Sequence, residues 1–260
     1  MDYKTFALQL AQEAGKIIRK NFMLGMKKEW KEDNTPLTET DLAINKLVLD
    51  SIKKEFPSHS LIAEEESNFN ENSEFVWVCD PLDGTIPFSH GIPTCVFSLA
   101  LVKKGEVILG VVYDPFMDRM FFAEKGRGAF LNNKKIHVSD SKTIKSKLTC
   151  VVPRMKKAPY DLSDFAKELM KREAIPINLM SITYMGALVA NGEFIATAFP
   201  ETHPHDTAAL KVIVEEAGGK VTDLFGNEQR YDRDIKGHLI TNGLIHKELV
   251  ELIKKTVKIM

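Results

Sequence analysis

Two aspartates within one short segment are the most informative chemical feature of this sequence. Residues 80–85 read Asp-Pro-Leu-Asp-Gly-Thr and directly follow the continuous apolar run 75–79, a pattern typical of a buried strand. Carboxylates at the end of such a strand lie at the edge where layered folds bind ligands. The proline stiffens the turn, so we expect Asp80 and Asp83 to point toward one locus.

Two carboxylates that converge in a turn repel each other unless a cation lies between them. Oxygen ligands favour a hard cation such as Mg²⁺, and the Leu82 carbonyl between the two acids is a further candidate ligand. Gly84 and Thr85 then offer backbone N–H groups to an anion. A divalent cation beside bound phosphate can polarise it and lower the pKa of a bound water, so the segment predicts a metal-dependent phosphatase of a small monoester.

Two further acidic points stand out along the chain. Glu64, Glu65 and Glu66 follow the apolar pair 61–62, and Asp206 follows His205 immediately before a predicted helix. Each point alone also has an ordinary structural explanation. An Asp-Pro and Asp-Gly pair is common in turns, a glutamate run is common on solvated surfaces, and an aspartate before a helix is a common N-cap.

Periodicity predicts the elements that must position these residues. Two helices come first, over 3–23 and from Thr38 to about Phe56, the second with a capping-box-like Thr38 and Asp41. A meander of antiparallel strands follows, and helix alternates with strand from about residue 140. The predicted strands cover 75–79, 94–102, 107–113, 120–123, 194–199, 221–222 and 238–241, and the later helices 164–171, 185–191, 207–217 and 246–258.

Length and composition describe an ordinary globular protein. The chain has 260 residues, of which 44% are apolar and 27% charged, which excludes disordered, collagen-like and membrane proteins. The length allows an N-terminal α+β half over 1–145 with most metal ligands, and a C-terminal α/β half over 146–260 that contributes Asp206 and the substrate pocket.

The charge balance and the cysteine count indicate partners and compartment. Lysine plus arginine total 35 against 36 acidic residues, a net charge of −1, so no bulk electrostatic attraction to nucleic acid or an anionic membrane is expected. Three cysteines without a Cys-x-x-Cys pair favour core residues over disulfides. With no signal peptide or apolar spanning run, we expect a cytoplasmic protein.

Four motifs in order resemble the inositol monophosphatase family of Mg²⁺-dependent, lithium-sensitive phosphatases. The segment 80–85, after a Trp77-containing strand, matches the signature D-P-[IL]-D-G-T, and 62–65 matches the upstream G-E-E segment with Ala63 for the usual glycine. Residues 206–219 match D-x-A-A…E-A-G-G, and 38–41 match T-x-x-D. The resemblance covers nearly the whole chain. It implies a layered α-β-α-β-α sandwich of the sugar-phosphatase type, with an antiparallel sheet in the N-terminal half and a second sheet in the C-terminal half, and a homodimer.

The resemblance also implies metal ligands. Glu64, Asp80 and the Leu82 carbonyl would hold one Mg²⁺, and Asp80, Asp83 and Asp206 would hold a second. A third, weaker ion could touch Glu64, which gives two or three ions in all.

It implies catalytic roles as well. Glu65 would position the attacking water, and Thr85, hydrogen-bonded to Asp41, would activate it for direct in-line attack on phosphorus. The backbone N–H groups of Gly84 and Thr85 would hold the phosphate.

Departures from the family pattern gather in the implied substrate pocket, formed by Ile182, Phe199, Glu201 and His205. His205 replaces the usual tryptophan before the last aspartate. Phe199 stands where inositol-specific members carry an acid, with Glu201 two residues on. The phosphatase chemistry is therefore expected, whereas the ester stays open between inositol phosphate, histidinol phosphate, fructose-1,6-bisphosphate and 3′-phosphoadenosine 5′-phosphate. A non-catalytic protein that binds metal or phosphate for regulation is the alternative of another class.

Two other residue types near the site have competing interpretations. His203 and His205 flank a proline and could bind zinc, but no third nitrogen or sulfur ligand is near in sequence, which favours pocket lining. Lys31 could approach the phosphate or could be an exposed loop lysine.

Overall fold

The computed structural model describes residues 1–30, 36–70, 73–155 and 158–260, so Lys31 lies outside the described residues. The described helices are α1 (Tyr3–Asn21), α2 (Glu39–Glu55), α3 (Thr85–Ser89), α4 (Ser163–Lys171), α5 (Ile182–Ala190), α6 (Ala208–Glu216) and α7 (His246–Thr256). The strands of the N-terminal half are β1 (Glu29–Trp30), β2 (Pro36–Leu37), β3 (Ser60–Ala63), β4 (Phe75–Asp83), β5 (Val96–Lys103), β6 (Glu106–Asp114), β7 (Arg119–Glu124), β8 (Ala129–Leu131) and β9 (Lys134–Lys135). The later strands are β10 (Leu148–Val151), β11 (Tyr160–Asp161), β12 (Ile175–Pro176), β13 (Phe194–Phe199), β14 (Lys220–Thr222), β15 (His238–Thr241) and β16 (Lys258–Ile259).

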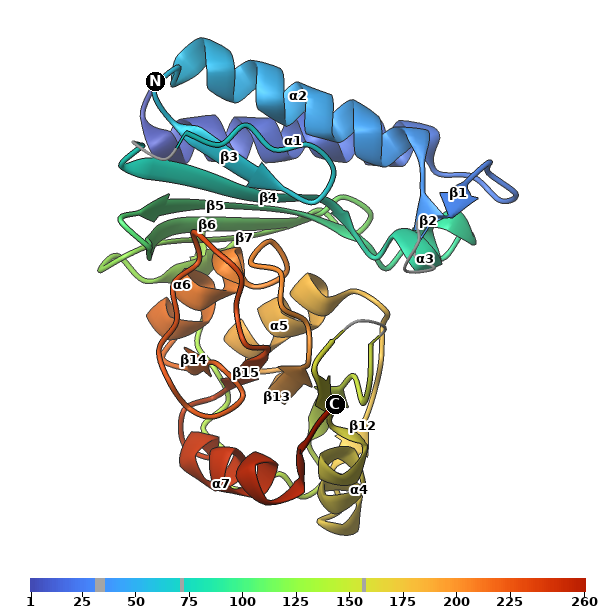
Figure 1. Cartoon of the computed structure of the whole chain (residues 1–260), viewed down its shortest axis with the longest axis vertical. Helices are drawn as coiled ribbons and strands as arrows, with labels where there is room; N and C mark the ends of the chain where they lie inside the picture. The colour runs from blue at the N-terminus through green and yellow to red at the C-terminus, as the bar shows by residue number, and fades with distance from the viewer. Residues whose placement is uncertain (31–35, 71–72, 156–157) are drawn as a thin grey trace.

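These elements stack in five layers (Figure 1). Helices α1 and α2 cover the outer face of one sheet, and α5 and α6 lie between that sheet and a second one. Helices α4 and α7 cover the far face of the second sheet. The predicted α-β-α-β-α sandwich is confirmed.

The first sheet has the strand order β3-β4-β5-β6-β7-β8-β9. All its neighbouring pairs are antiparallel except β3 and β4, which run parallel. Strands β4 to β6 are buried along almost their whole length because helices cover both faces, which explains their continuous apolar runs. The predicted tip at Asn132 and Asn133 is a tight hairpin in which both residues have positive φ.

The second sheet is mixed and has the order β12-β10-β13-β15-β14. Strand β10 is parallel to both β12 and β13, whereas β15 is antiparallel to both β13 and β14. This arrangement directs the end of β13 toward the segment that precedes α6, which carries Asp206.

The helix boundaries follow capping chemistry. The predicted capping box is present at α2, where the Thr38 hydroxyl accepts a bond from the Thr40 N–H and the Thr38 N–H donates to Asp41. Helix α5 begins at Ile182, three residues before the predicted start at Met185. The N-cap residue Ser181 makes no side-chain capping bond within the helix, and the first N–H groups of α5 donate instead to Asp83, which is distant in the sequence.

Two glycines allow the central helices to pack closely. A Cβ at Gly110 of β6 would lie 2.5 Å from the Ala209 carbonyl oxygen of α6. A Cβ at Gly186 of α5 would lie 2.2 Å from a methyl group of Leu210, also in α6. Helix α6 therefore contacts the first sheet at a separation that only glycine permits, and Leu210 of α6 packs closely against Gly186 of α5.

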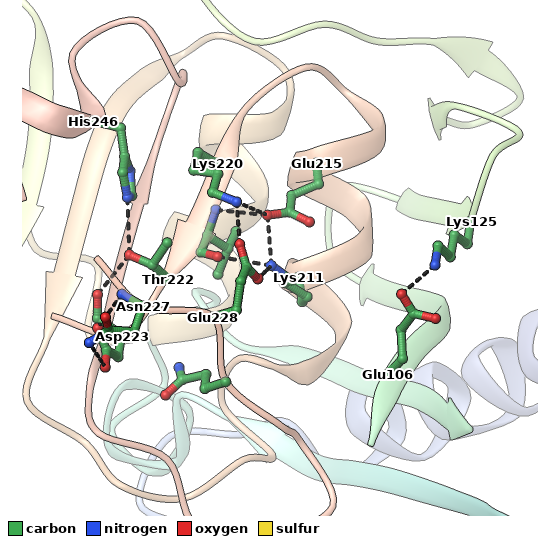
Figure 2. A network of polar contacts seen from close by, with 12 residues as sticks. Glu106, Lys125, Lys211, Glu215, Lys220, Thr222, Asp223, Asn227, Glu228 and His246 are labelled. Atoms are coloured by element: carbon green, nitrogen blue, oxygen red, sulfur yellow. Dashed lines mark hydrogen bonds and ion pairs between the residues drawn. The ribbon is translucent and has the colours of Figure 1, made fainter. Parts of the chain in front are cut away.

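A network of ion pairs connects α6 with the segment that follows it (Figure 2). The Lys211 ammonium, which is largely buried, donates to Glu215 at 2.7 Å, to Glu228 at 2.5 Å and to the Val221 carbonyl at 3.0 Å. Glu228 also pairs with Lys220. A cavity of about 460 Å³ adjoins this network and is lined by none of the residues predicted for the active site.

The contact at Gly110 generates a stability prediction. Gly110→Ala would force a methyl group against the backbone of α6, and we expect a loss of about 1–3 kcal/mol of unfolding free energy, as for other overpacked core positions. Urea unfolding followed by far-UV circular dichroism measures it. Lys53→Ala, at an exposed position of α2, is the control and should change stability by less than about 0.5 kcal/mol. An unchanged midpoint in Gly110→Ala would contradict the close approach.

Candidate active site

The end of β4 carries the first two acidic residues. The pairing register of β4 with β5 shifts between Asp80 and Asp83, so the strand bulges where it leaves the sheet. The Asp80 carboxylate accepts a hydrogen bond from the Leu82 N–H at 2.9 Å, which fixes the turn. Gly84 follows at φ +94, and a Cβ there would lie 2.8 Å from the Thr94 carbonyl oxygen, so the turn requires glycine.

Asp206 joins these two residues from the other half of the chain. Carboxylate oxygens of Asp80, Asp83 and Asp206 all lie within 4.8 Å of one another, and all three residues are buried. Three buried carboxylates at this separation form an oxygen-only donor set, which fits a hard divalent cation. The structure thus brings together the aspartates that the sequence analysis assigned to one metal centre.

The N-terminus of α5 holds Asp83. The Ser181 hydroxyl donates to Asp83 Oδ2 at 2.5 Å, the Thr183 N–H to the same oxygen at 2.7 Å, and the Ile182 N–H to Oδ1 at 3.2 Å. The Thr183 hydroxyl donates to the Asp206 carbonyl at 3.1 Å. One helix end therefore binds segments from both halves of the chain.

A second polar pair lies beside this cluster. The Thr85 hydroxyl, at the start of α3, is 3.1 Å from Asp41 Oδ1 and 2.9 Å from the Leu82 carbonyl oxygen, so it can donate to either acceptor. The other oxygen of Asp41 accepts bonds from Thr38. Burial raises the pKa of Asp41 to about 6, although the bonds from Thr38 lower it.

Burial and mutual repulsion control the charge of the three aspartates. Burial raises the pKa of Asp83 to about 6, although the bonds from the start of α5 oppose this shift. The pKa of Asp80 is raised well above its usual value by burial and then by the charges of Glu64 and the neighbouring aspartates. Burial and then the charge of Glu201 raise the pKa of Asp206 in the same direction. Without a cation, the cluster therefore retains protons at pH values where isolated aspartates are ionised.

Glu64 and Glu65 leave the end of β3 next to the cluster. The Glu64 N–H donates to the Cys79 carbonyl at 3.3 Å, which sets it beside the end of β4, and both glutamates are half-buried. The Glu64 charge raises the pKa of Asp80, so the two carboxylates influence each other. Glu64 is outside the group of carboxylates that lie within 4.8 Å of one another.

The pocket residues divide into two kinds. Phe199 has no exposed surface, and its ring packs against His238 at a centroid distance of 4.8 Å. The expectation that Phe199 lines the substrate pocket is therefore corrected to a core role, because its side chain is fully buried in a hydrophobic cluster. Ile182 is half-buried at the start of α5 and contacts Asp83 through its backbone N–H.

Glu201, His203 and His205 form a polar border next to Asp206. His205 Nε2 lies 3.9 Å from Asp206 Oδ2, and the His203 and His205 rings stack at 5.3 Å between centroids. Glu201 Oε1 accepts the Thr202 N–H at 2.7 Å and lies 3.7 Å from His203 Nε2. Among the described residues, the cluster that could hold a metal consists of Asp80, Asp83 and Asp206 and includes neither histidine.

Ser181 and Thr183 are site residues that the sequence did not reveal. Neither residue has a motif or a charge, and a serine four residues before the predicted helix start is an ordinary N-terminal residue. The available signal was the two hydroxyl residues that flank Ile182 at the start of an otherwise apolar helix. Such a helix N-terminus can bind an anionic group.

The raised pKa values generate a pH prediction for the metal. The pKa of Asp83 is about 6 in the folded protein, whereas an aspartate in the unfolded chain has a pKa of about 3.9. Protonated Asp83 therefore contributes to the stability of the metal-free fold below about pH 4, and this contribution is lost as the pH rises to about 6. A divalent cation needs the ionised carboxylates, so the gain in melting temperature caused by Mg²⁺ should be small near pH 4.5 and large near pH 7.5. Thermal melts with MgCl₂ and with chelator at matched ionic strength measure this. An equal gain at both pH values would contradict it.

Comparisons with known proteins agree with this geometry. A family model described as the inositol monophosphatase family matches residues 2–258. A Thermotoga maritima protein described as fructose-1,6-bisphosphatase/inositol-1-monophosphatase is 36% identical over 222 residues, 85% of this chain and 84% of that protein. Inositol monophosphatase 2 of Solanum lycopersicum is 36% identical over 269 residues, 98% of this chain and 99% of its own length.

Solved structures give the same result. An inositol monophosphatase of Thermotoga maritima superimposes with a TM-score of 0.86 at 32% identity and covers 98% of both chains. The extragenic suppressor protein SuhB of Bartonella henselae gives a TM-score of 0.87 at 27% identity over 97% of this chain and 98% of that one. The chain therefore belongs to the inositol monophosphatase family, and it is a phosphatase that hydrolyses phosphoric monoesters.

Proposed function

We propose that this phosphatase uses Mg²⁺ to release phosphate from a small phosphorylated polyol or sugar. One observation carries the proposal: the buried carboxylates of Asp80, Asp83 and Asp206 converge beside the Thr85–Asp41 hydrogen bond. Carboxylates this close need a divalent cation to be ionised together at neutral pH. Membership of the family shows a phosphatase but does not identify the bound cation or the phosphate ester.

The family motifs imply the metal ligands, and the convergence of Asp80, Asp83 and Asp206 supports the second of the two main sites. Glu64, Asp80 and the Leu82 carbonyl would hold one Mg²⁺, and Asp80, Asp83 and Asp206 a second, with a weaker third ion touching Glu64. The Thr85 hydroxyl has a single proton, which it donates either to Asp41 or to the Leu82 carbonyl, so the carbonyl oxygen keeps at least one lone pair that can face a cation. Bound Mg²⁺ would polarise the phosphate and lower the pKa of a bound water.

The side chains of this protein orient the water and hold its proton. When the Thr85 hydroxyl donates to Asp41, its own oxygen is directed to accept a proton from the attacking water. Asp41, with a pKa of about 6, is suited to share that proton near neutral pH. Gly84 and Thr85 would hold phosphate oxygens through their backbone N–H groups, and Glu65 would orient the water from the opposite side.

The polar border next to Asp206 supports a hydroxyl-bearing substrate. Glu201 is mostly buried and close enough to Asp206 to raise its pKa, so its carboxylate can accept hydrogen bonds from substrate hydroxyls. His205 and Ile182 would line the same pocket, and the core position of Phe199 removes it from contact with the ester. This position of Glu201 favours a sugar or inositol phosphate over an ester without hydroxyl groups.

We also propose that each chain consists of an N-terminal half, 1–145, and a C-terminal half, 146–260. We further propose that two copies of the chain form a homodimer in the cytoplasm. Three free and buried cysteines support a reducing compartment. In the described part of the chain, no helix has the length and apolarity needed to cross a membrane. Size-exclusion chromatography with light scattering tests the dimer.

A substrate panel tests the proposal as a whole. Phosphate release is measured with Mg²⁺ from inositol-1-phosphate, fructose-1,6-bisphosphate, histidinol phosphate and 3′-phosphoadenosine 5′-phosphate. The highest kcat/KM is expected for one of the first two. A preference for either of the others would overturn the substrate class. Calorimetric Mg²⁺ binding without turnover of any ester would favour a non-catalytic regulatory protein.

Asp83→Asn tests the metal centre. We expect it to reduce kcat/KM by more than about 100-fold, because even outer-shell partners of a metal are worth 10–100-fold. Chelator should abolish turnover of the unmodified enzyme. Asp50→Asn, an exposed aspartate on α2, is the control and should retain full activity. Undiminished turnover in Asp83→Asn or in chelator would disprove the metal mechanism.

Glu201→Gln tests hydroxyl recognition. Loss of a charged acceptor should lower kcat/KM for the preferred sugar or inositol ester by about 10–100-fold, since hydrogen bonds to charged groups are worth about 1.5–3 kcal/mol. Turnover of phenyl phosphate, which lacks hydroxyl groups, should change much less. Glu193→Gln at an exposed position is the control. An equal loss on both esters would argue against a role in recognition.

A further inference from the structure

Ser181 and Thr183 connect the two halves of the metal centre. Both residues are completely buried at the start of α5. The Ser181 hydroxyl binds the Asp83 carboxylate, and the Thr183 hydroxyl binds the Asp206 backbone carbonyl. A single helical turn thus contacts a carboxylate from the first sheet and the chain that carries a carboxylate from the second half.

The helix does not satisfy its own N-terminus in the usual way. Ser181 is the N-cap of α5, yet its hydroxyl makes no capping bond within that helix. The Asp83 carboxylate takes the place of a cap instead, accepting the N–H groups of Ile182 and Thr183. Asp83 is therefore held by α5 as well as by its own strand.

The surrounding contacts keep this helix end in place. An ideal Cβ on Gly84 would lie 3.1 Å from the Ser181 Cβ, so the turn after Asp83 packs directly on the serine. The Thr94 hydroxyl donates to the Leu179 carbonyl at 3.0 Å, a further bond from the first half to the segment that precedes α5. Because both sides are buried and packed, the hydroxyls have little freedom to choose other partners.

We propose that Ser181 and Thr183 are positioning residues that hold Asp83 and Asp206 at the separation needed to bind Mg²⁺. The inference rests on the proposed Mg²⁺ site. Both residues act through their partners and need not touch the substrate. Displacing a metal ligand by about 1 Å strongly reduces the function of a catalytic site. We therefore expect the two hydroxyl hydrogen bonds to affect Mg²⁺ affinity more than they affect the stability of the fold.

Isothermal titration of the metal-free protein with MgCl₂ tests the proposal. Ser181→Ala and Thr183→Val should each weaken Mg²⁺ binding by about 10–100-fold, as expected for outer-shell partners of a metal, while the melting temperature in chelator falls only slightly. Thr183→Ser keeps the hydroxyl and should restore the affinity. Ser60→Ala and Thr197→Val, two buried hydroxyls away from the carboxylates, are the controls and should bind Mg²⁺ like the unmodified protein.

The outcomes separate this inference from the proposed function. Normal Mg²⁺ affinity in both Ser181→Ala and Thr183→Val would overturn the positioning role alone. Absence of Mg²⁺ binding by the unmodified protein would overturn the proposed metal site and this inference with it. If Thr183→Val does not fold, Ser181→Ala decides, because it removes one oxygen and leaves the two backbone donors to Asp83 in place.

Discussion

Repulsion among three buried carboxylates is the constraint on which this structure depends. Asp80, Asp83 and Asp206 would not gather in a low-dielectric interior without compensation, and the fold supplies it from backbone and hydroxyl donors. This compensation is uneven. Asp83 accepts several bonds and keeps a pKa of about 6, whereas burial shifts the pKa of Asp80 and Asp206 further upward. The site thus presents three buried carboxylates that could hold a cation, and a bound cation would favour their joint ionisation.

The layers of the fold serve this arrangement. Strand β4 delivers two aspartates at its end, and the loop before α6 delivers the third after crossing from the second sheet. Helices α5 and α6 lie between the sheets, and the glycines at 110 and 186 allow them to approach closely. The ion pairs of Lys211 with Glu215 and Glu228 hold α6 against the segment that follows it (Figure 2).

Local sequence predicted much of this because motifs and periodicity are local. The run 75–79, the capping box at Thr38 and the helix at 207–217 all follow from neighbouring residues and were confirmed within a few positions. The start of α5 and the roles of Ser181 and Thr183 were not predicted, because their partners come from another part of the chain. Phe199 was assigned to the pocket from its position relative to a family motif, and such a local position does not show how deeply the rest of the fold will bury the side chain.

The position of α6 between two sheets also has a kinetic consequence. Asp206 reaches the other aspartates only after the second sheet has docked, so the complete ligand set depends on contacts between residues far apart in the chain. Such contacts form late and slow the folding of a chain. A cation that recognises only the docked state stabilises the native protein more than the transition state, and it therefore retards unfolding while leaving the folding rate nearly unchanged. The metal would lengthen the lifetime of the enzyme once assembled, without guiding its assembly.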